Sequence, residues 1–386
     1  MGATLTNRGL WNRNFCLIIL ADMLLYASVY MLFPVLHGQI MAAGKCTDLQ
    51  AGWGIVVFGL GVFVPGMLNA YLVDRFPRKS VCAYSILALG VLTLAYPYVS
   101  GLWQVGLLRG LQGACYGIAL MSMGSTLAID VTPTHFRDHA NVNFTWSGLI
   151  GMFLGVLFGL DGLQYVTFQE FLWISAILSF VAVMLVAMVD VCFRAPLEVP
   201  FFSFDRFLLF RALVPGLNMA VVPVILGIIL GTVSDSGFYI CMCGGFVVFL
   251  LIGGPLTSAL GGRILNGLGF LLVLASIGVL GTCEDGASLW GAGMIAGLGM
   301  GFSLFQFLRM MILLPLHCER GTGYHTYQLL WCTGVIGGYL LGRWQASATD
   351  TSPFVTAFCI GTAGLLFYQL FVHRYYIDRL KENNII

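Results

Sequence analysis

An acidic residue lies deep inside an apolar stretch of this sequence. Asp22 is seven residues beyond Phe15 in the run 15–36, which contains no other charged residue. Tyr26 and Tyr30 follow at intervals of four residues, and this spacing places all three side chains on one face of a helix. A carboxylate that is shielded from water favours its protonated form more than an exposed carboxylate does. We therefore expect Asp22 to carry protons; the alternative is a fixed ion pair that ties two helices together.

Arginines lie inside three other apolar stretches, at positions 109, 211 and 309. A charge at the centre of a membrane helix costs about 2.5–3.5 kcal/mol on insertion scales, so each of these residues needs a partner, water or a function. Gln112 and Tyr116 share the helical face of Arg109 and are expected to bond to it. The alternatives are a structural tie for Arg109 and, for Arg211, a side chain that extends to the membrane interface.

Neutral polar and aromatic residues accompany these charges. Arginine binds carboxylate and phosphate groups through paired donors, so two guanidinium groups against one carboxylate favour an anionic or amphipathic solute. Side chains near the ends of the spans equally fit packing against neighbouring helices. The candidate cavity residues are Asp22, Tyr26, Tyr30, Arg109, Gln112, Tyr116, Arg211, Asn218, Gln306, Arg309, Gln328 and Trp331.

The composition predicts that lipid surrounds the elements that hold these residues. The chain is 59% hydrophobic and 9% charged, against about 25% charged in ordinary soluble domains. A bilayer core needs roughly 20 apolar residues per helix. The sequence therefore predicts an all-α membrane protein with twelve transmembrane helices, near 15–36, 50–73, 80–99, 102–130, 139–160, 168–193, 207–231, 236–261, 264–282, 287–315, 323–345 and 352–373.

The basic residues predict the orientation of these spans. Most Lys and Arg fall at the span ends of one side, whereas the other side has only Lys45 and Arg343. The positive-inside rule then places both termini in the cytoplasm. The first apolar run is too long for a signal-peptide core, so we expect it to be an uncleaved span.

Two parts of the chain repeat each other. At an offset of 183 residues, Arg137, Gly151, Gly155, Leu157 and Gly159 coincide with Arg320, Gly334, Gly338, Leu340 and Gly342. This repeat predicts two pseudo-symmetric six-helix halves, 1–193 and 206–386, joined by a short cytoplasmic linker at 194–205.

A charged segment between the second and third spans resembles the corresponding loop of major facilitator transporters, which follows the pattern Gly-x-x-x-Asp-Arg-x-Gly-Arg-Lys. Four of its positions carry the family's residues, and Ala70 and Pro77 stand where the family has glycine. The resemblance implies a cytoplasmic gate in which Asp74 faces the start of the eleventh span. The gate residues are predicted to be Asp74, Arg75, Arg78, Lys79, Arg137 and Arg320.

Two further segments resemble elements of the same family. The segment from Arg109 to Gly113 is similar to the Arg-x-x-x-Gly element of the fourth helix, which implies proton coupling through Asp22 and Arg109. The glycines of the fifth span resemble the antiporter signature, although Val156 replaces its proline. The resemblance thus implies a proton-coupled antiporter.

These observations together predict a secondary active transporter that works by alternating access and moves a small organic solute, with export favoured over uptake. The alternatives are an uptake symporter or facilitator, and a transport-inactive receptor or scaffold of the same fold. The sequence has no His-Glu-x-x-His and no Gly-x-Ser-x-Gly motif, so we expect no enzyme activity. We expect no metal and no cofactor beyond the proton gradient, no nucleic-acid partner, and a monomer in a bacterial inner membrane or a plasma membrane.

Overall fold

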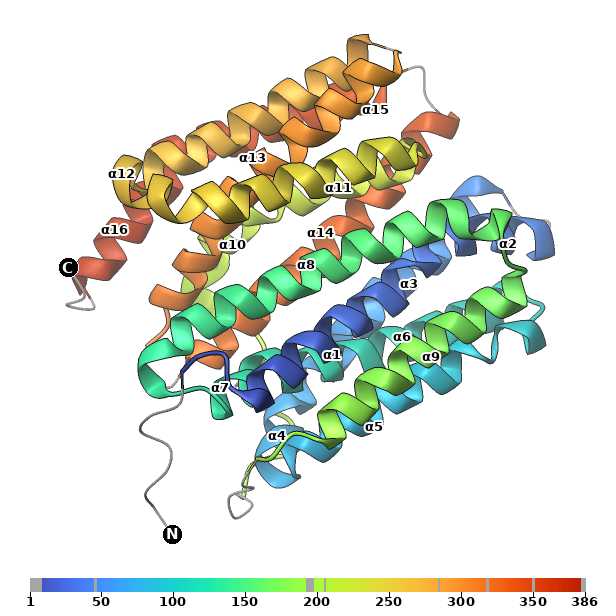
Figure 1. Cartoon of the computed structure of the whole chain (residues 1–386), viewed down its shortest axis with the longest axis horizontal. Helices are drawn as coiled ribbons and strands as arrows, with labels where there is room; N and C mark the ends of the chain where they lie inside the picture. The colour runs from blue at the N-terminus through green and yellow to red at the C-terminus, as the bar shows by residue number, and fades with distance from the viewer. Residues whose placement is uncertain are drawn as a thin grey trace. The chain divides into compact units, whose positions relative to one another are not determined.

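The computed structural model describes residues 9–44, 47–191, 198–204, 206–283, 285–316, 319–348 and 351–382, apart from the side chains of 42–44, 258 and 320. Every regular element in these ranges is helical (Figure 1). The first elements are α1 (Arg13–Tyr30), α2 (Leu32–Gly44), α3 (Asp48–Phe63), η1 (Val64–Leu68), α4 (Asn69–Arg75), α5 (Arg78–Thr93), η2 (Tyr96–Tyr98), α6 (Leu102–Ser122), η3 (Met123–Leu127), α7 (Ala128–Asp130), η4 (Thr134–Phe136), α8 (Arg137–Asp161), η5 (Gly162–Gln164) and α9 (Phe168–Ala187).

The second part of the chain continues the same pattern. Gly261, with a φ of 74°, interrupts α12 at the boundary predicted between the eighth and ninth spans. The elements are η6 (Phe210–Ala212), α10 (Leu213–Met219), α11 (Val221–Thr232), α12 (Ser236–Thr282), α13 (Gly286–Leu313), α14 (Arg320–Ala348), α15 (Pro353–Phe367), η7 (Tyr368–Val372) and α16 (His373–Glu382).

The predicted spans all fold as helices. Nine helical stretches of the described chain are long and apolar enough to cross a membrane. The other three predicted spans, 80–99, 102–130 and 323–345, are helical in α5, α6 and α14. The prediction of an all-α membrane protein is confirmed.

Side-chain caps fix where several helices begin. Asn12 accepts a hydrogen bond from the backbone N–H of Phe15 at 3.0 Å and so starts α1. Thr167 and Glu170 form a capping box at the start of α9. Asp285 starts α13 by accepting from the backbone N–H of Ser288, and this bond lowers the pKa of the Asp285 carboxyl.

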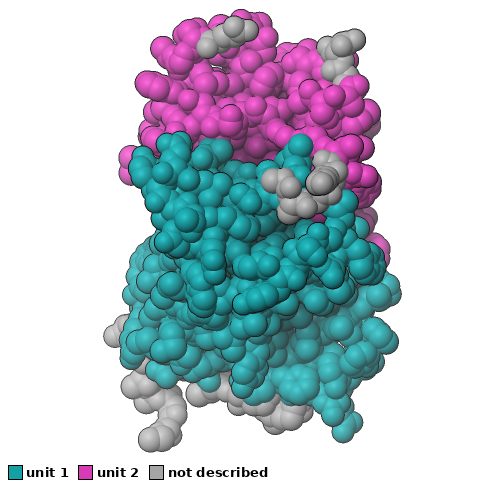
Figure 2. Space-filling model, turned by 90° about the vertical axis from the view of Figure 1, so that its right-hand side faces the viewer, with its two compact units in different colours: residues 1–46, 57–209, 318–329 teal, residues 47–56, 210–317, 330–386 magenta. Residues whose placement is uncertain are grey.

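The chain divides into two compact units, coloured teal and magenta in Figure 2. Unit 1 comprises Met1–Cys46, Val57–Leu209 and Cys318–Leu329, and unit 2 comprises Thr47–Val56, Phe210–His317 and Leu330–Ile386. Both α3 and α14 therefore contribute residues to each unit. The division predicted from the sequence, with boundaries at 193 and 206, stays a prediction.

In unit 1, a stripe of glycines brings α8 against α1. A Cβ atom at any of these glycines would overlap backbone atoms of α1, so only glycine allows the helices to approach this closely. The contacts pair Gly151 with Met23, Gly155 with Ala27 and Gly159 with Met31. The same helix α1 also packs on α9, while α5 packs on α6 and α9.

In unit 2, the same contact recurs between α14 and α11. The glycines that coincide at the 183-residue offset again face backbone carbonyls of the partner helix: Gly334 faces Ala220, Gly338 faces Val224 and Gly342 faces Ile228. The close approach of α6 to α3, at Gly113 and Phe58, likewise recurs between α13 and α12, at Gly297 and Met242. The sequence repeat is therefore a repeat of helix packing.

Candidate functional site

Asp22 is fully buried on α1, with 0% of its side chain exposed. Ser147 of α8 donates a hydrogen bond to its Oδ2 atom at 3.0 Å. Its Oδ1 atom has no hydrogen-bond partner among the described residues. The glycine stripe explains this neighbourhood: a Cβ atom on Gly148 would lie 3.0 Å from Asp22 Oδ2, so glycine lets α8 reach the carboxylate. Such a carboxylate is well placed to exchange a proton, because protonation removes its charge from an apolar interior.

Aromatic rings continue from Asp22 along the same face of α1. Tyr26 and Tyr30 stack with their centroids 5.8 Å apart, as their spacing predicts. Tyr116 of α6 contacts Tyr26 edge-on at 5.8 Å, and Phe58 of α3 lies 5.6 Å from Tyr116. These four rings connect the helix of Asp22 to α6.

Arg109 lies on α6 with only 1% of its side chain exposed. Its Nη1 atom donates to Gln112 Oε1 at 3.3 Å, as the helical spacing predicts. The same oxygen accepts from Tyr96 Oη at 2.7 Å, and Gln112 Nε2 donates to Thr93 Oγ1 at 3.0 Å. The guanidinium carbon lies 4.5 Å from the ring centroid of Phe58. Arg109 forms no ion pair with Asp22 or with any other described acid.

The candidate residues of unit 2 have different surroundings. Asn218 is buried, and its Nδ2 atom donates to the carbonyl of Gly364 at 2.9 Å. Gln306 is also buried. Arg309 is exposed on α13, unlike the buried position that its sequence context predicts. Arg211 is half-buried, and its carbonyl accepts from Tyr375 Oη at 2.9 Å.

The two candidates on α14 fall in different units. Gln328 belongs to unit 1, where its Nε2 atom donates to Tyr324 Oη at 3.5 Å. Trp331 belongs to unit 2 and is buried. Its indole Nε1 has no hydrogen-bond partner in the described part of the chain.

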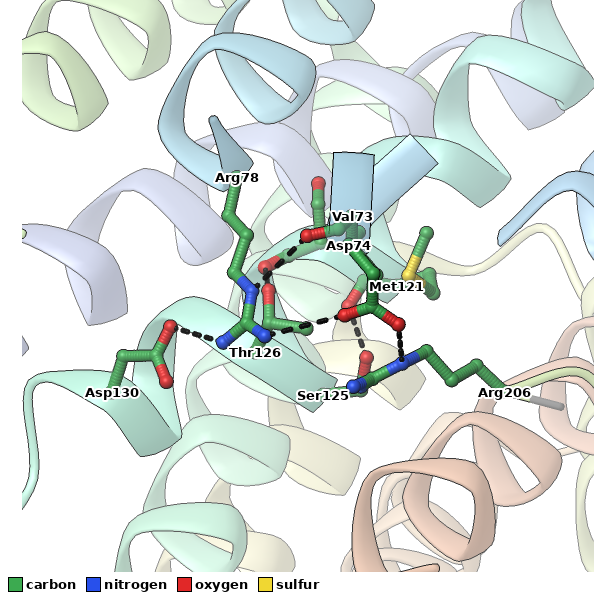
Figure 3. A network of polar contacts seen from close by, with 9 residues as sticks. Val73, Asp74, Arg78, Met121, Ser125, Thr126, Asp130 and Arg206 are labelled. Atoms are coloured by element: carbon green, nitrogen blue, oxygen red, sulfur yellow. Dashed lines mark hydrogen bonds and ion pairs between the residues drawn. The ribbon is translucent and has the colours of Figure 1, made fainter. Parts of the chain in front are cut away.

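A network of ion pairs surrounds Asp74 at the end of α4 (Figure 3). Its Oδ2 atom lies 3.0 Å from Arg206 Nε, and its Oδ1 atom lies 3.4 Å from Arg78 Nη2. Arg78 also pairs with Asp130 at 2.7 Å and donates from Nε to the carbonyl of Val73 at 3.3 Å. The Asp74 side chain is only 10% exposed, so water screens these contacts only in part.

The backbone of Arg206 adopts the left-handed conformation, with a φ of 60°. This region is uncommon for residues other than glycine, and holding it costs on the order of 1–3 kcal/mol. Hydrogen bonds around the residue hold it in place. Asn69 Nδ2 donates to its carbonyl at 3.3 Å and also contacts His325 Nε2 at 2.9 Å. The backbone N–H of Leu209 donates to Thr326 Oγ1 at 2.9 Å.

The other predicted gate residues lie around this network without joining it. Arg75 stacks on the ring of Tyr71 at 5.2 Å, and Lys79 Nζ donates to the carbonyl of Val189 at 2.9 Å. Arg137 is half-buried and forms no ion pair with a described acid. The side chain of Arg320 lies outside the described residues.

The partner of Asp74 differs from the predicted one. The sequence favours the neighbourhood of Arg320, with Arg137 as a second partner, whereas Arg206 and Arg78 form the ion pairs. The start of α14 is nevertheless close, because a Cβ atom on Gly321 would lie 3.9 Å from Arg206 Nη1. The sequence signal for Arg206 is only its position at the end of the linker, directly before an apolar run.

Sequence and structure comparisons agree on the family. The sequence profile of the Major Facilitator Superfamily matches residues 18–339. The chain belongs to this superfamily. It is 25% identical over 187 residues to an uncharacterized transporter, BU466, of Buchnera aphidicola. That match covers 47% of this chain and 44% of the relative, so the chain spans less than half the length of that relative.

A solved structure supports the fold of this superfamily member. A variant of the nucleoside transporter NupG has a similar fold, with a TM-score of 0.65 and 13% sequence identity. The similarity covers 96% of this chain and 99% of that one. At this identity, the comparison establishes the architecture alone.

Proposed function

We propose that this superfamily member is a secondary transporter that couples the movement of a small organic solute to the protonation of Asp22. The observation that carries the proposal is a fully buried carboxylate with one hydrogen-bond donor, Ser147, and no described cation paired with it. A fixed structural ion pair would place a base beside Asp22. A group that gains and loses a proton during the transport cycle requires no such base.

Arg109 regulates this proton exchange in our proposal. The contacting rings of Tyr26, Tyr116 and Phe58 lie between the Asp22 region and the guanidinium of Arg109. Both charges belong to unit 1, so a shift of α1 against α6 within that unit alters both environments together. The proposed direction is export by exchange for protons, which rests on the glycine stripe of α8 and its resemblance to the antiporter signature.

The ion pairs of Asp74 form the cytoplasmic latch of the proposed transport cycle. They connect the α4 end to Arg206, a residue that follows the linker in the sequence. The strained backbone of Arg206 favours release, while the ion pair and the bond from Asn69 oppose it. Two opposing contributions of similar size suit a contact that must break and reform in every cycle.

Flux into proteoliposomes tests the transport proposal. Purified protein is reconstituted, a pH gradient is imposed, and uptake of labelled nucleosides, organic anions and amphipathic cations is measured. We expect accumulation of at least one solute class that collapses when a protonophore removes the gradient. Equal flux with and without the gradient would establish a facilitator instead. Saturable binding without flux of any solute would establish a receptor.

A double-mutant cycle tests the latch. Asp74→Asn and Arg206→Gln each remove one charge of the pair, and we expect each to change the transport rate about three- to tenfold, with the double variant no worse than the stronger single one. Arg75→Gln serves as the control, because Arg75 stacks on Tyr71 outside the network. Additive effects of Asp74→Asn and Arg206→Gln would contradict the latch.

A further inference from the structure

The guanidinium of Arg109 has unused hydrogen-bond donors. Its Nη1 atom bonds to Gln112, but Nε and Nη2 have no partner among the described residues. Arginine stays protonated in proteins, so the charge remains whatever the pH. The rings of Phe58 and Phe33, at 4.5 and 5.6 Å, stabilise it only in part. A buried charge that lacks a counter-ion is strongly unfavourable.

A small cavity of unit 1 adjoins this guanidinium. Its wall includes the polar side chains of Ser28, Thr93, Arg109 and Gln112, while the remaining lining residues are apolar and no acid lines it. The wall hydroxyls are already committed: Ser28 donates to the carbonyl of Leu25, and Thr93 donates to that of Leu89. The free donors beside the cavity therefore belong to Arg109.

We propose that this cavity binds one small monovalent anion, of the size of chloride, as the counter-ion of Arg109. The space holds about one particle the size of a water molecule, which admits a halide and excludes sulfate or phosphate. A water molecule would accept a hydrogen bond but would leave the positive charge uncompensated. The site is independent of the proposed proton coupling, because it rests on Arg109 and the cavity wall alone.

Thermal unfolding of the purified full-length protein tests this site. Chloride replaces gluconate at constant ionic strength, and we expect a saturable rise of about 3 °C in Tm. Sulfate should produce no such rise. Arg109→Gln should abolish the chloride effect, whereas Arg13→Gln, which changes an exposed arginine at the start of α1, should retain it. A Tm that does not depend on chloride would overturn the proposal, as would an equal shift in Arg109→Gln.

A second measurement keeps the test decisive if Arg109→Gln fails to fold. Wild-type crystals are grown in bromide, and the anomalous signal locates the ion. A bromide peak within hydrogen-bond distance of Arg109 Nε or Nη2, together with the chloride-dependent Tm, supports the site. A water molecule in that position, or a bromide peak without any chloride effect in solution, contradicts it.

Discussion

The contact of α8 with α1 in unit 1 and that of α14 with α11 in unit 2 use one backbone arrangement with different side chains around it. The α1 carbonyls and their α11 counterparts are related by a constant offset of 197 residues. At this offset Asp22 coincides with Met219, which is also fully buried. At the offset of the glycines, its donor Ser147 coincides with Leu330.

The contact of α6 with α3 shows the same contrast. Its glycines coincide with those of α13 at an offset of 184 residues, and Arg109 then coincides with Gly293. The shared packing therefore forms in unit 2 without either buried charge. The fold alone does not require Asp22 or Arg109, which supports a functional reason for their presence in unit 1.

The in-span arginines of unit 2 complete the comparison. Arg309 is exposed and Arg211 is half-buried, while the buried polar residues Asn218 and Gln306 are neutral amides. A buried amide is much less costly than a buried charge. Unit 2 thus keeps its interior uncharged, and the charge-dependent steps of the proposed mechanism belong to unit 1.

The largest expected effect comes from removing the acid that unit 2 lacks. Asp22→Asn keeps the shape and an oxygen for the bond from Ser147, but it cannot exchange a proton. We expect gradient-driven accumulation in proteoliposomes to fall to the level of empty liposomes, with the unfolding temperature unchanged. Asp161→Asn, at the end of α8, is the matched control. Normal accumulation by Asp22→Asn would show that protons enter elsewhere.

The reverse change places an acid in the apolar copy. Met219→Asp buries a carboxylate with no donor at the position of Ser147, and we expect a loss of about 2.5–3.5 kcal/mol in the free energy of unfolding. Equilibrium unfolding in mixed micelles measures this change. Met219→Asn should cost less, because its side chain is neutral. If Met219→Asp is as stable as the wild type, the contrast between the two interiors loses its energetic basis.

The shared scaffold itself can be broken at its glycines. Gly338→Val forces a side chain against the carbonyl of Val224, and we expect it to destabilise the protein by about 1–3 kcal/mol. Gly155→Val should cost a similar amount at the equivalent contact with Ala27. Gly337 has open space at its Cβ position, so Gly337→Val is the neighbouring control. Equal stabilities of the Gly337 and Gly338 variants would refute the close-approach argument.

The smallest effect is expected at the exposed arginine. Arg309→Gln removes a partly solvated charge, so we expect binding of anionic solutes to weaken about two- to fivefold and binding of neutral solutes to stay unchanged. Equilibrium binding of a charged and an uncharged solute of similar size measures the difference. Equal losses for both solutes would remove the case for a charge-selective role of Arg309.

The sequence by itself determined the helical spans and the internal repeat. Long apolar runs can exist in a membrane only as structures that satisfy their own backbone, so hydropathy was enough to predict the helices. The glycine spacing in α8 and α14 gave the repeat, because helix contacts of this kind need small residues at fixed intervals. Asp22 and Arg109 stood out for the same reason: membrane interiors rarely hold charge.

Only the tertiary structure decided which residues these charges meet. Ser147 lies 125 positions from Asp22, and Arg206 lies 132 positions from Asp74. The exposure of Arg309 and the cavity beside Arg109 were equally invisible in the sequence. Helical periodicity gives the face on which a side chain lies, but the neighbour of that face depends on how the helices pack. The sequence therefore indicated which residues could do chemistry, and helix packing decided which of them are buried and with what partners.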